Sequence, residues 1–129
     1  MTTERVVLDT SVLIAESAPG DVAAAISVVS LAELHYGTLL AVGDPDELAR
    51  RTARLARVEA TFEPLPVTAD IAREWGRLAA AVRNRGAQPR KRQLDLLIAA
   101  TAAHEQIPLL THNLQDFKVI EDLVEAREP

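Results

Sequence analysis

One stretch near the start of the chain decides its fold class: Arg5-Val6-Val7-Leu8-Asp9-Thr10-Ser11-Val12-Leu13-Ile14. Its run of two valines and a leucine, bounded by polar residues, predicts a short buried strand. The Asp-Thr-Ser that follows can start a helix reaching Glu16. A strand that is apolar on both faces and leads straight into a helix is typical of a parallel sheet with helices on both sides.

The same alternation of strands and helices continues along the chain. We expect Ser30 and Glu33 to form a capping box at the start of the second helix, and Asp44 and Thr68 to cap the next two. Expected strands lie at 25–29, 63–67, 107–110 and 123–126, and expected helices at 30–42, 45–62, 68–82 and 94–105. The prediction is a single domain, 1–129, with a three-layer α/β/α fold and a mostly parallel central sheet of four to five strands.

Composition narrows the class of protein. The 129 residues are 48% hydrophobic, which favours a folded globular chain over a disordered one. The chain has no cysteine, so disulfides and thiolate metal sites are excluded. Neither a signal peptide nor an apolar run long enough to span a bilayer is evident, and we expect a cytoplasmic protein.

Four acidic residues are placed where predicted strands end or helices begin. Asp9, Glu33 and Asp116 each follow a predicted strand, and Asp95 lies in the first turn of an apolar helix. Ligand sites in open parallel sheets form beyond the carboxyl ends of the strands. We therefore expect these four side chains to converge in one crevice.

Taken singly, each acid has a simpler explanation, as a helix cap, a partner of a helix dipole or a turn residue. Taken together, converging carboxylates repel one another unless some are protonated or a cation neutralises them. Oxygen ligands alone suit Mg²⁺ or Mn²⁺. Such a cation can activate water and stabilise the transition state of phosphoryl transfer.

The net charge of −5 argues against a generally cationic surface, but basic residues gather in one segment. Five of them and no acid lie between Arg83 and Leu94. Arg90, Lys91 and Arg92 come just before Asp95, where they either contact the phosphates of RNA or form a solvated loop.

Four stretches resemble, in order, the motifs of PIN domains. The first two are Val6-Val7-Leu8-Asp9-Thr10-Ser11-Val12-Leu13-Ile14 and Ser30-Leu31-Ala32-Glu33-Leu34. The last two are Asp95-Leu96-Leu97-Ile98-Ala99-Ala100-Thr101-Ala102 and Leu110-Thr111-His112-Asn113-Leu114-Gln115-Asp116-Phe117. Among PIN domains, the short chain and Asp-Leu-Leu-Ile-Ala-Ala most resemble the VapC toxins of bacterial toxin–antitoxin pairs.

That resemblance implies a Mg²⁺- or Mn²⁺-dependent endoribonuclease that forms a homodimer and is neutralised by a small VapB antitoxin. It implies that Asp9 and Asp95 bind the metal most directly, and that Glu33 and Asp116 bind it through water or orient the attacking water. Ser11, Thr111 and Asn113 would support the acids or the scissile phosphate. His112 stands where the family often has arginine.

Three other readings compete with the nuclease. A haloacid-dehalogenase-like phosphatase would need a second aspartate two residues after Asp9, where this chain has Ser11. A receiver domain would need paired early acids and a late lysine, and neither is evident. A catalytically silent interaction module would keep the fold while the acids served as caps, and the absence of Mg²⁺-linked stabilisation would identify it.

Overall fold

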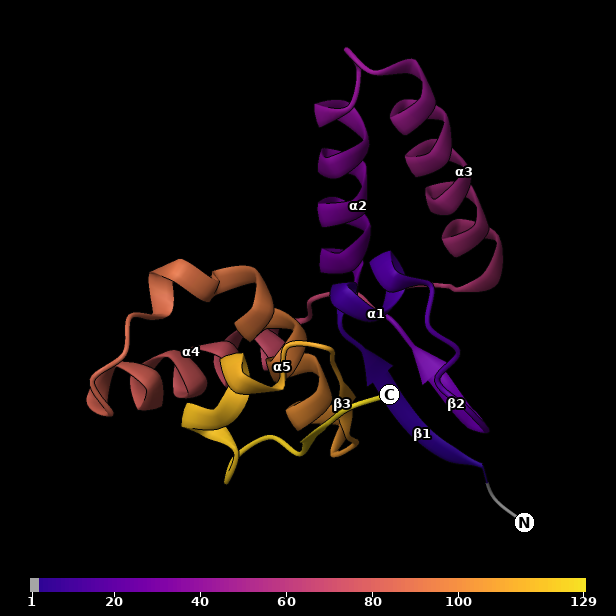
Figure 1. Cartoon of the computed structure of the whole chain (residues 1–129). Coiled ribbons are helices and arrows are strands. Elements are labelled where there is room, and N and C mark those ends of the chain that lie inside the picture. Colours follow the sequence, from indigo (N-terminus) through magenta and orange to yellow (C-terminus); the bar gives the residue numbers. More distant parts are fainter. Residues whose placement is uncertain (1–2) are drawn as a thin grey trace.

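The computed structural model describes residues 3–129, in which helices surround a small sheet (Figure 1). The elements of the first half are β1 (Glu4–Leu8), α1 (Thr10–Ala15), β2 (Val22–Ala25), α2 (Val28–Leu40) and α3 (Pro45–Thr61). Those of the second half are α4 (Ala69–Asn84), the 3₁₀ helix η1 (Pro89–Arg92), α5 (Gln93–Glu105), β3 (Leu109–Leu110), the 3₁₀ helix η2 (Leu114–Ile120) and β4 (Ala126–Arg127).

The sheet has four strands in the order β2-β1-β3-β4, and every pair is parallel. Val6 is in register with Ala24 of β2, and Leu8 is in register with Leu110 of β3. From β1 the chain continues to β2 on one side of it, and it later returns to form β3 on the other side. The direction in which strands are added therefore reverses between β1 and β3. This switch point is where an open parallel sheet forms a crevice beyond its strand ends.

Each face of the sheet has its own apolar core. Val7 is fully buried and packs with the core residues of α4, α5 and η2. Val6 and Leu8 point to the opposite face, where they pack with α1, α2 and α3. Because successive side chains of a strand alternate between faces, the three-residue apolar run supplies both cores. The predicted layers of helix, sheet and helix are confirmed.

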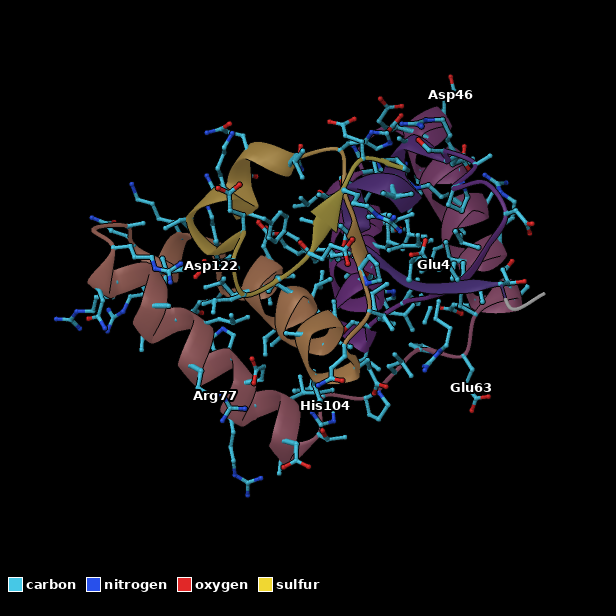
Figure 2. The ribbon with its side chains drawn as sticks, turned by 90° about the horizontal axis from the view of Figure 1, so that it is seen from below. Glu4, Asp46, Glu63, Arg77, His104 and Asp122 are labelled. Atoms are coloured by element: carbon cyan, nitrogen blue, oxygen red, sulfur yellow. The ribbon has the colours of Figure 1, made fainter. Side chains whose placement is uncertain are left out.

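The two helical layers differ in shape. The helices α2 and α3 form an antiparallel pair that projects beyond the sheet, whereas α5 packs on β1 and α4 packs on α5 (Figure 1). The guanidinium of Arg51 on α3 donates to the carbonyl of Gly37 on α2 at 2.7 Å, which ties the pair together. Asp46, at the start of α3, and Glu63, just after that helix, point away from the body of the protein (Figure 2).

Two predicted boundaries around the second helix are wrong. The strand expected at 25–29 ends at Ala25, and Ser27 caps α2 by accepting a hydrogen bond from the backbone of Val29 at 3.0 Å. Ser30 therefore lies inside the helix and does not form the expected capping box. Ser27 and Ser30 are both typical cap residues, and the pairing of β2 with β1 decided between them.

The strand expected at 63–67 is reduced to one residue. Leu65 forms an isolated parallel bridge to Ser27, donating to the carbonyl of Ile26 and accepting from the N–H of Val28. Pro64 and Pro66 on either side have no N–H to donate, so the pairing cannot extend. The last strand, expected at 123–126, consists of Ala126 and Arg127.

The predicted caps of α3 and α4 are confirmed. The carboxylate of Asp44 accepts from the backbone N–H of Glu47 at 3.2 Å, and the hydroxyl of Thr68 accepts from that of Ile71 at 3.2 Å. Within residues 3–129, none of the helices has both the length and the apolar character needed to cross a bilayer.

Thr68→Ala is expected to lower the free energy of unfolding by about 1 kcal/mol, because the N–H groups of the first turn of α4 lose their side-chain acceptor. Urea titration followed by circular dichroism measures the change. Thr68→Ser keeps the hydroxyl and serves as the control. An equal loss in both variants would show that the methyl group, rather than the cap, stabilises this helix.

Candidate active site

Asp9 lies at the centre of the crevice, directly after β1. It is only 2% exposed, and its Oδ2 accepts hydrogen bonds from the hydroxyls of Ser11 and Thr111, both at 2.8 Å. Thr111 follows β3, so this contact crosses the switch point of the sheet. Asp9 starts α1 but makes no side-chain cap bond to that helix. The simpler reading of Asp9 as a helix cap is therefore wrong.

The proton directions around Asp9 are fixed by the backbone. The hydroxyl of Ser11 accepts from the N–H of His112 at 3.0 Å, and that of Thr111 accepts from the N–H of Asn113 at 2.9 Å. Both hydroxyl protons are consequently donated to Asp9 Oδ2. The other oxygen, Oδ1, is buried and has no hydrogen-bond partner. A buried carboxylate oxygen without a donor is costly, so Oδ1 is open to a water or an ion.

Glu33 reaches the crevice from α2 through a chain of hydroxyls. Thr10 donates to Glu33 Oε1 at 2.7 Å, which leaves Ser30 as the donor in its 2.8 Å contact with Thr10. Burial raises the pKa of Glu33 above its usual value, and the nearby charge of Asp9 raises it further. The alternative role of Glu33 in a capping box is excluded, because its side chain bonds to α1 instead.

Asp95 faces the same space from the first turn of α5. Burial raises the pKa of this carboxyl to about 6, and the charges of Asp9, Glu33 and Asp116 add to the effect. Arg92 acts in the opposite direction and is the weakest of these influences. Mutual repulsion of this kind is what the converging acids were expected to show.

Three of the four acids line one open cavity of about 760 Å³. Its walls are mainly apolar, and its rim carries polar side chains from the segment after β3. The lining consists of Asp9, Thr10, Ser11, Ile14, Ala15, Ala32, Glu33, Tyr36, Leu94, Asp95, His112 and Asn113. The cavity therefore combines an acidic centre with an apolar approach.

Asp116 departs from the expected convergence. It forms an ion pair with Arg92 and lines a second cavity of about 440 Å³ instead of the first. Nowhere in residues 3–129 do three His, Asp or Glu side chains lie close enough to hold one metal ion as they stand. Asp116 still acts electrostatically on Asp95, but it is paired with Arg92 and lies outside the lining of the first cavity.

The three basic residues before Asp95 differ in their surroundings. Arg90, Lys91 and Arg92 all lie on η1, but only Arg92 contacts an acid of the site. Lys91 joins Arg92 in the lining of the second cavity, whereas Arg90 lines a separate small cavity with Arg83. The cluster is thus exposed at the edge of the site.

Sequence reasoning missed the roles of Thr10 and Ser30. Both are buried; Thr10 donates to Glu33, and Ser30 bonds to Thr10. The sequence did contain a signal for these roles, because each residue lies close in sequence to a candidate acid and a buried hydroxyl needs a hydrogen-bond partner. The expected capping box assigned Ser30 a different role and so hid its contact with Thr10.

A family model described as "PIN domain" matches residues 6–123, which is most of the chain. This chain is a PIN domain. Its four predicted motifs all fall within the matched region.

Curated relatives narrow the family further. The PIN domain is 40% identical to Ribonuclease VapC5 of Mycobacterium tuberculosis over 122 residues, which cover 89% of this chain and 87% of that protein. It is 38% identical to Ribonuclease VapC8 of the same organism over 100 residues, covering 74% and 88%. The chain thus belongs to the VapC family of PIN domains.

Solved structures agree with this assignment. The PIN domain is similar to a chain of the toxin–antitoxin complex VapBC-5 from M. tuberculosis, with 38% identity, a TM-score of 0.81 and 96% of each chain covered. It shares the fold of a chain of VapBC2 from Rickettsia felis bound to a DNA fragment, at 23% identity and a TM-score of 0.76, over 96% of this chain and 98% of that one.

Asp95→Asn is expected to stabilise the metal-free PIN domain at neutral pH. Because its pKa is raised from 3.8 to about 6, ionisation of Asp95 destabilises the folded state progressively as pH rises through that interval. We expect a gain of about 1–2 kcal/mol at pH 7 after allowing for solvent screening, and little gain near pH 4. Urea unfolding in EDTA at both pH values measures it.

The exposed Glu121→Gln is the control, since it removes a carboxylate charge outside the acidic cavity. A loss of stability in Asp95→Asn at pH 7, or a gain that does not depend on pH, would contradict the electrostatic account.

Proposed function

We propose that this PIN domain is the ribonuclease toxin of a toxin–antitoxin pair, and that it hydrolyses RNA phosphodiester bonds with a bound Mg²⁺ or Mn²⁺. One observation supports the proposal above all. The buried carboxylate of Asp9 is fixed through one oxygen, and its other oxygen has no partner, beside two further carboxyls with raised pKa values. The family and its curated relatives, both named as ribonucleases, support the substrate class.

The residues fit a hard divalent cation. The acids of the cavity offer carboxylate oxygens, which suit Mg²⁺ and Mn²⁺, and the chain has no cysteine for metals that prefer thiolate. Asp9 and Asp95 would hold the ion most directly. Glu33 and Asp116 would bind it through water, which agrees with the absence of a ready three-acid ligand set in residues 3–129.

When bound, the cation would supply an activated water and stabilise the charge that develops on the scissile phosphate. The chain's own residues prepare this chemistry. Ser11 and Thr111 hold the orientation of Asp9 by donating to Oδ2. Thr10 occupies Oε1 of Glu33, so the second oxygen of this raised-pKa carboxyl is left to orient a water or accept its proton.

Substrate and partners are expected at the surfaces around the acidic cavity. Arg90, Lys91 and Arg92 on η1 would contact the RNA backbone. Asn113 and His112 on the rim would lie near the scissile phosphate. The VapBC-5 neighbour is a toxin–antitoxin complex, and by this similarity we propose a VapB-like antitoxin as partner, with action on RNA in the cytoplasm.

The end of α2 presents an apolar surface suited to a protein partner. Tyr36, Leu39, Leu40 and Val42 are each more than half exposed there. An apolar surface of this kind indicates an interaction site. It is available both to the antitoxin and to the second copy of a homodimer.

Asp9→Asn and Asp95→Asn are each expected to reduce RNA cleavage at least about a hundredfold, because each removes a carboxylate charge from the cation site. Incubation of total RNA with the purified, antitoxin-free protein in Mg²⁺, Mn²⁺ or EDTA tests this. Cutting should require the cation and disappear in either variant.

Asp70→Asn is the matched control, because Asp70 is exposed on α4 and paired with Arg73 rather than placed in the crevice. Cleavage that persists in EDTA would remove the metal from the mechanism. A folded wild type that neither cuts RNA nor gains stability from Mg²⁺ would favour a silent interaction module.

We also expect the antitoxin to inhibit by placing a basic side chain against Asp9, Glu33 and Asp95, with apolar neighbours against Tyr36 and Leu94. The acidic centre and apolar walls of the cavity are complementary to such a segment. Replacing the basic residues of the antitoxin's toxin-binding segment by glutamine should weaken inhibition at least tenfold in a cleavage assay. Full inhibition by the neutralised segment would exclude this arrangement.

A further inference from the structure

The four acids of the site differ in their cationic neighbours. In the part of the chain that the structure describes, residues 3–129, no Lys, Arg or His forms an ion pair with Asp9, Glu33 or Asp95. Asp116 alone is paired, with Arg92. The pair therefore keeps the fourth acid occupied by a cation of the protein itself.

The pair lies at a second cavity that is suited to an anion. Lys91 and Arg92 supply positive charge, and Gln88 and Gln115 supply amide groups. Apolar side chains, among them Val82, Leu96 and Val119, also line the cavity. Leu94 and Asp95 line the acidic cavity, so both cavities border the first turn of α5. A polyanion bound along this turn can reach both.

The ion pair is open to exchange. The side chain of Arg92 is 44% exposed and that of Asp116 is 32% exposed. Pairs exposed to this extent are weak, because water competes for both charges. A guanidinium can bind a phosphate through two parallel hydrogen bonds, as it can a carboxylate, so a phosphate of RNA can take the place of Asp116 on Arg92.

A purely structural role for the pair is disfavoured by a second anchor. Arg85, at the end of α4, donates to the carbonyl of Val119 at 2.6 Å and pairs with both carboxylate oxygens of Asp122. Phe117 and Ile120 also bury η2 in the core. Because η2 is held by these contacts, it does not need the exposed Arg92–Asp116 pair to stay in place.

We propose that the second cavity is a phosphate subsite for RNA, in which Arg92 exchanges Asp116 for a phosphate and thereby frees Asp116 to complete the acidic site. Arg92 is then a positioning residue that acts through Asp116. This proposal rests on the proposed function, since it assigns a step to RNA binding. It makes RNA and the divalent cation mutually reinforcing ligands, because each favours the state in which Asp116 is free.

The first test is the affinity of the RNA-free protein for Mn²⁺, measured by calorimetry. Arg92→Gln should bind Mn²⁺ about threefold to fivefold more tightly than wild type, the factor that corresponds to breaking an exposed ion pair. Arg90→Gln removes the same charge from the same 3₁₀ helix but breaks no pair with an acid of the site. It should leave Mn²⁺ affinity unchanged. Equal gains in both variants would overturn the proposal.

The second test repeats the comparison in the Asp116→Asn background. The gain from Arg92→Gln should disappear there, because Arg92 has no acid to occupy. A gain in Mn²⁺ affinity that persists would mean that the positive charge of Arg92 acts on the cation directly and not through Asp116. The proposed exchange would then be wrong. Mn²⁺ binding undetectable in both wild type and Arg92→Gln would overturn it as well.

The third test measures binding of a fluorescein-labelled mixed-sequence oligoribonucleotide in EDTA, where no cutting occurs. Asp116→Asn should tighten binding when Arg92 is present and have no effect in the Arg92→Gln variant. An equal effect in both backgrounds would contradict the exchange. A protein that fails to cut RNA in Mg²⁺ or Mn²⁺ would refute the proposed nuclease, and the Mn²⁺ comparison would still decide the exchange.

Discussion

The hydrogen bonds that Ser11 and Thr111 donate to Asp9 join the two central strands of the sheet at the point where the winding reverses. They keep a buried carboxylate in place at the carboxyl end of β1, and every other part of the site is arranged around it. The run Val6-Val7-Leu8 fixes the position of Asp9 at the end of β1, because these residues pack into the two cores on opposite faces of the sheet. The position of Asp9 is therefore set by packing and its orientation by hydroxyls.

The arrangement of acids works against folding and in favour of ligand binding. Burial and like charges raise the pKa values of Glu33 and Asp95, so ionisation of these carboxyls destabilises the fold. A divalent cation bound as proposed would relieve this repulsion and so stabilise the protein. The large apolar cores below the crevice allow the fold to tolerate this cost. Such opposition between stability and ligand binding is common at functional sites.

The two 3₁₀ helices form the edge of the site. The acids Asp9, Glu33 and Asp95 belong to elements that pack on the sheet, whereas Arg92 and Asp116 come from η1 and η2. Charges on such short elements can exchange partners without disturbing a core. In the proposed exchange, the Arg92–Asp116 pair couples the fixed acidic centre to the recognition of a polyanion.

The sequence by itself determined the parallel fold, the caps at Asp44 and Thr68, and which acids follow strands, because periodicity and cap chemistry are local properties. Only the tertiary structure decided that Ser27 rather than Ser30 starts α2, since strand pairing selects between two equally good caps. It also decided that Thr10 hydrogen-bonds Glu33 with Ser30 behind it, and that Arg92 pairs with Asp116. These contacts join residues far apart in the chain, and which charges meet depends on how helices pack, which no local pattern encodes.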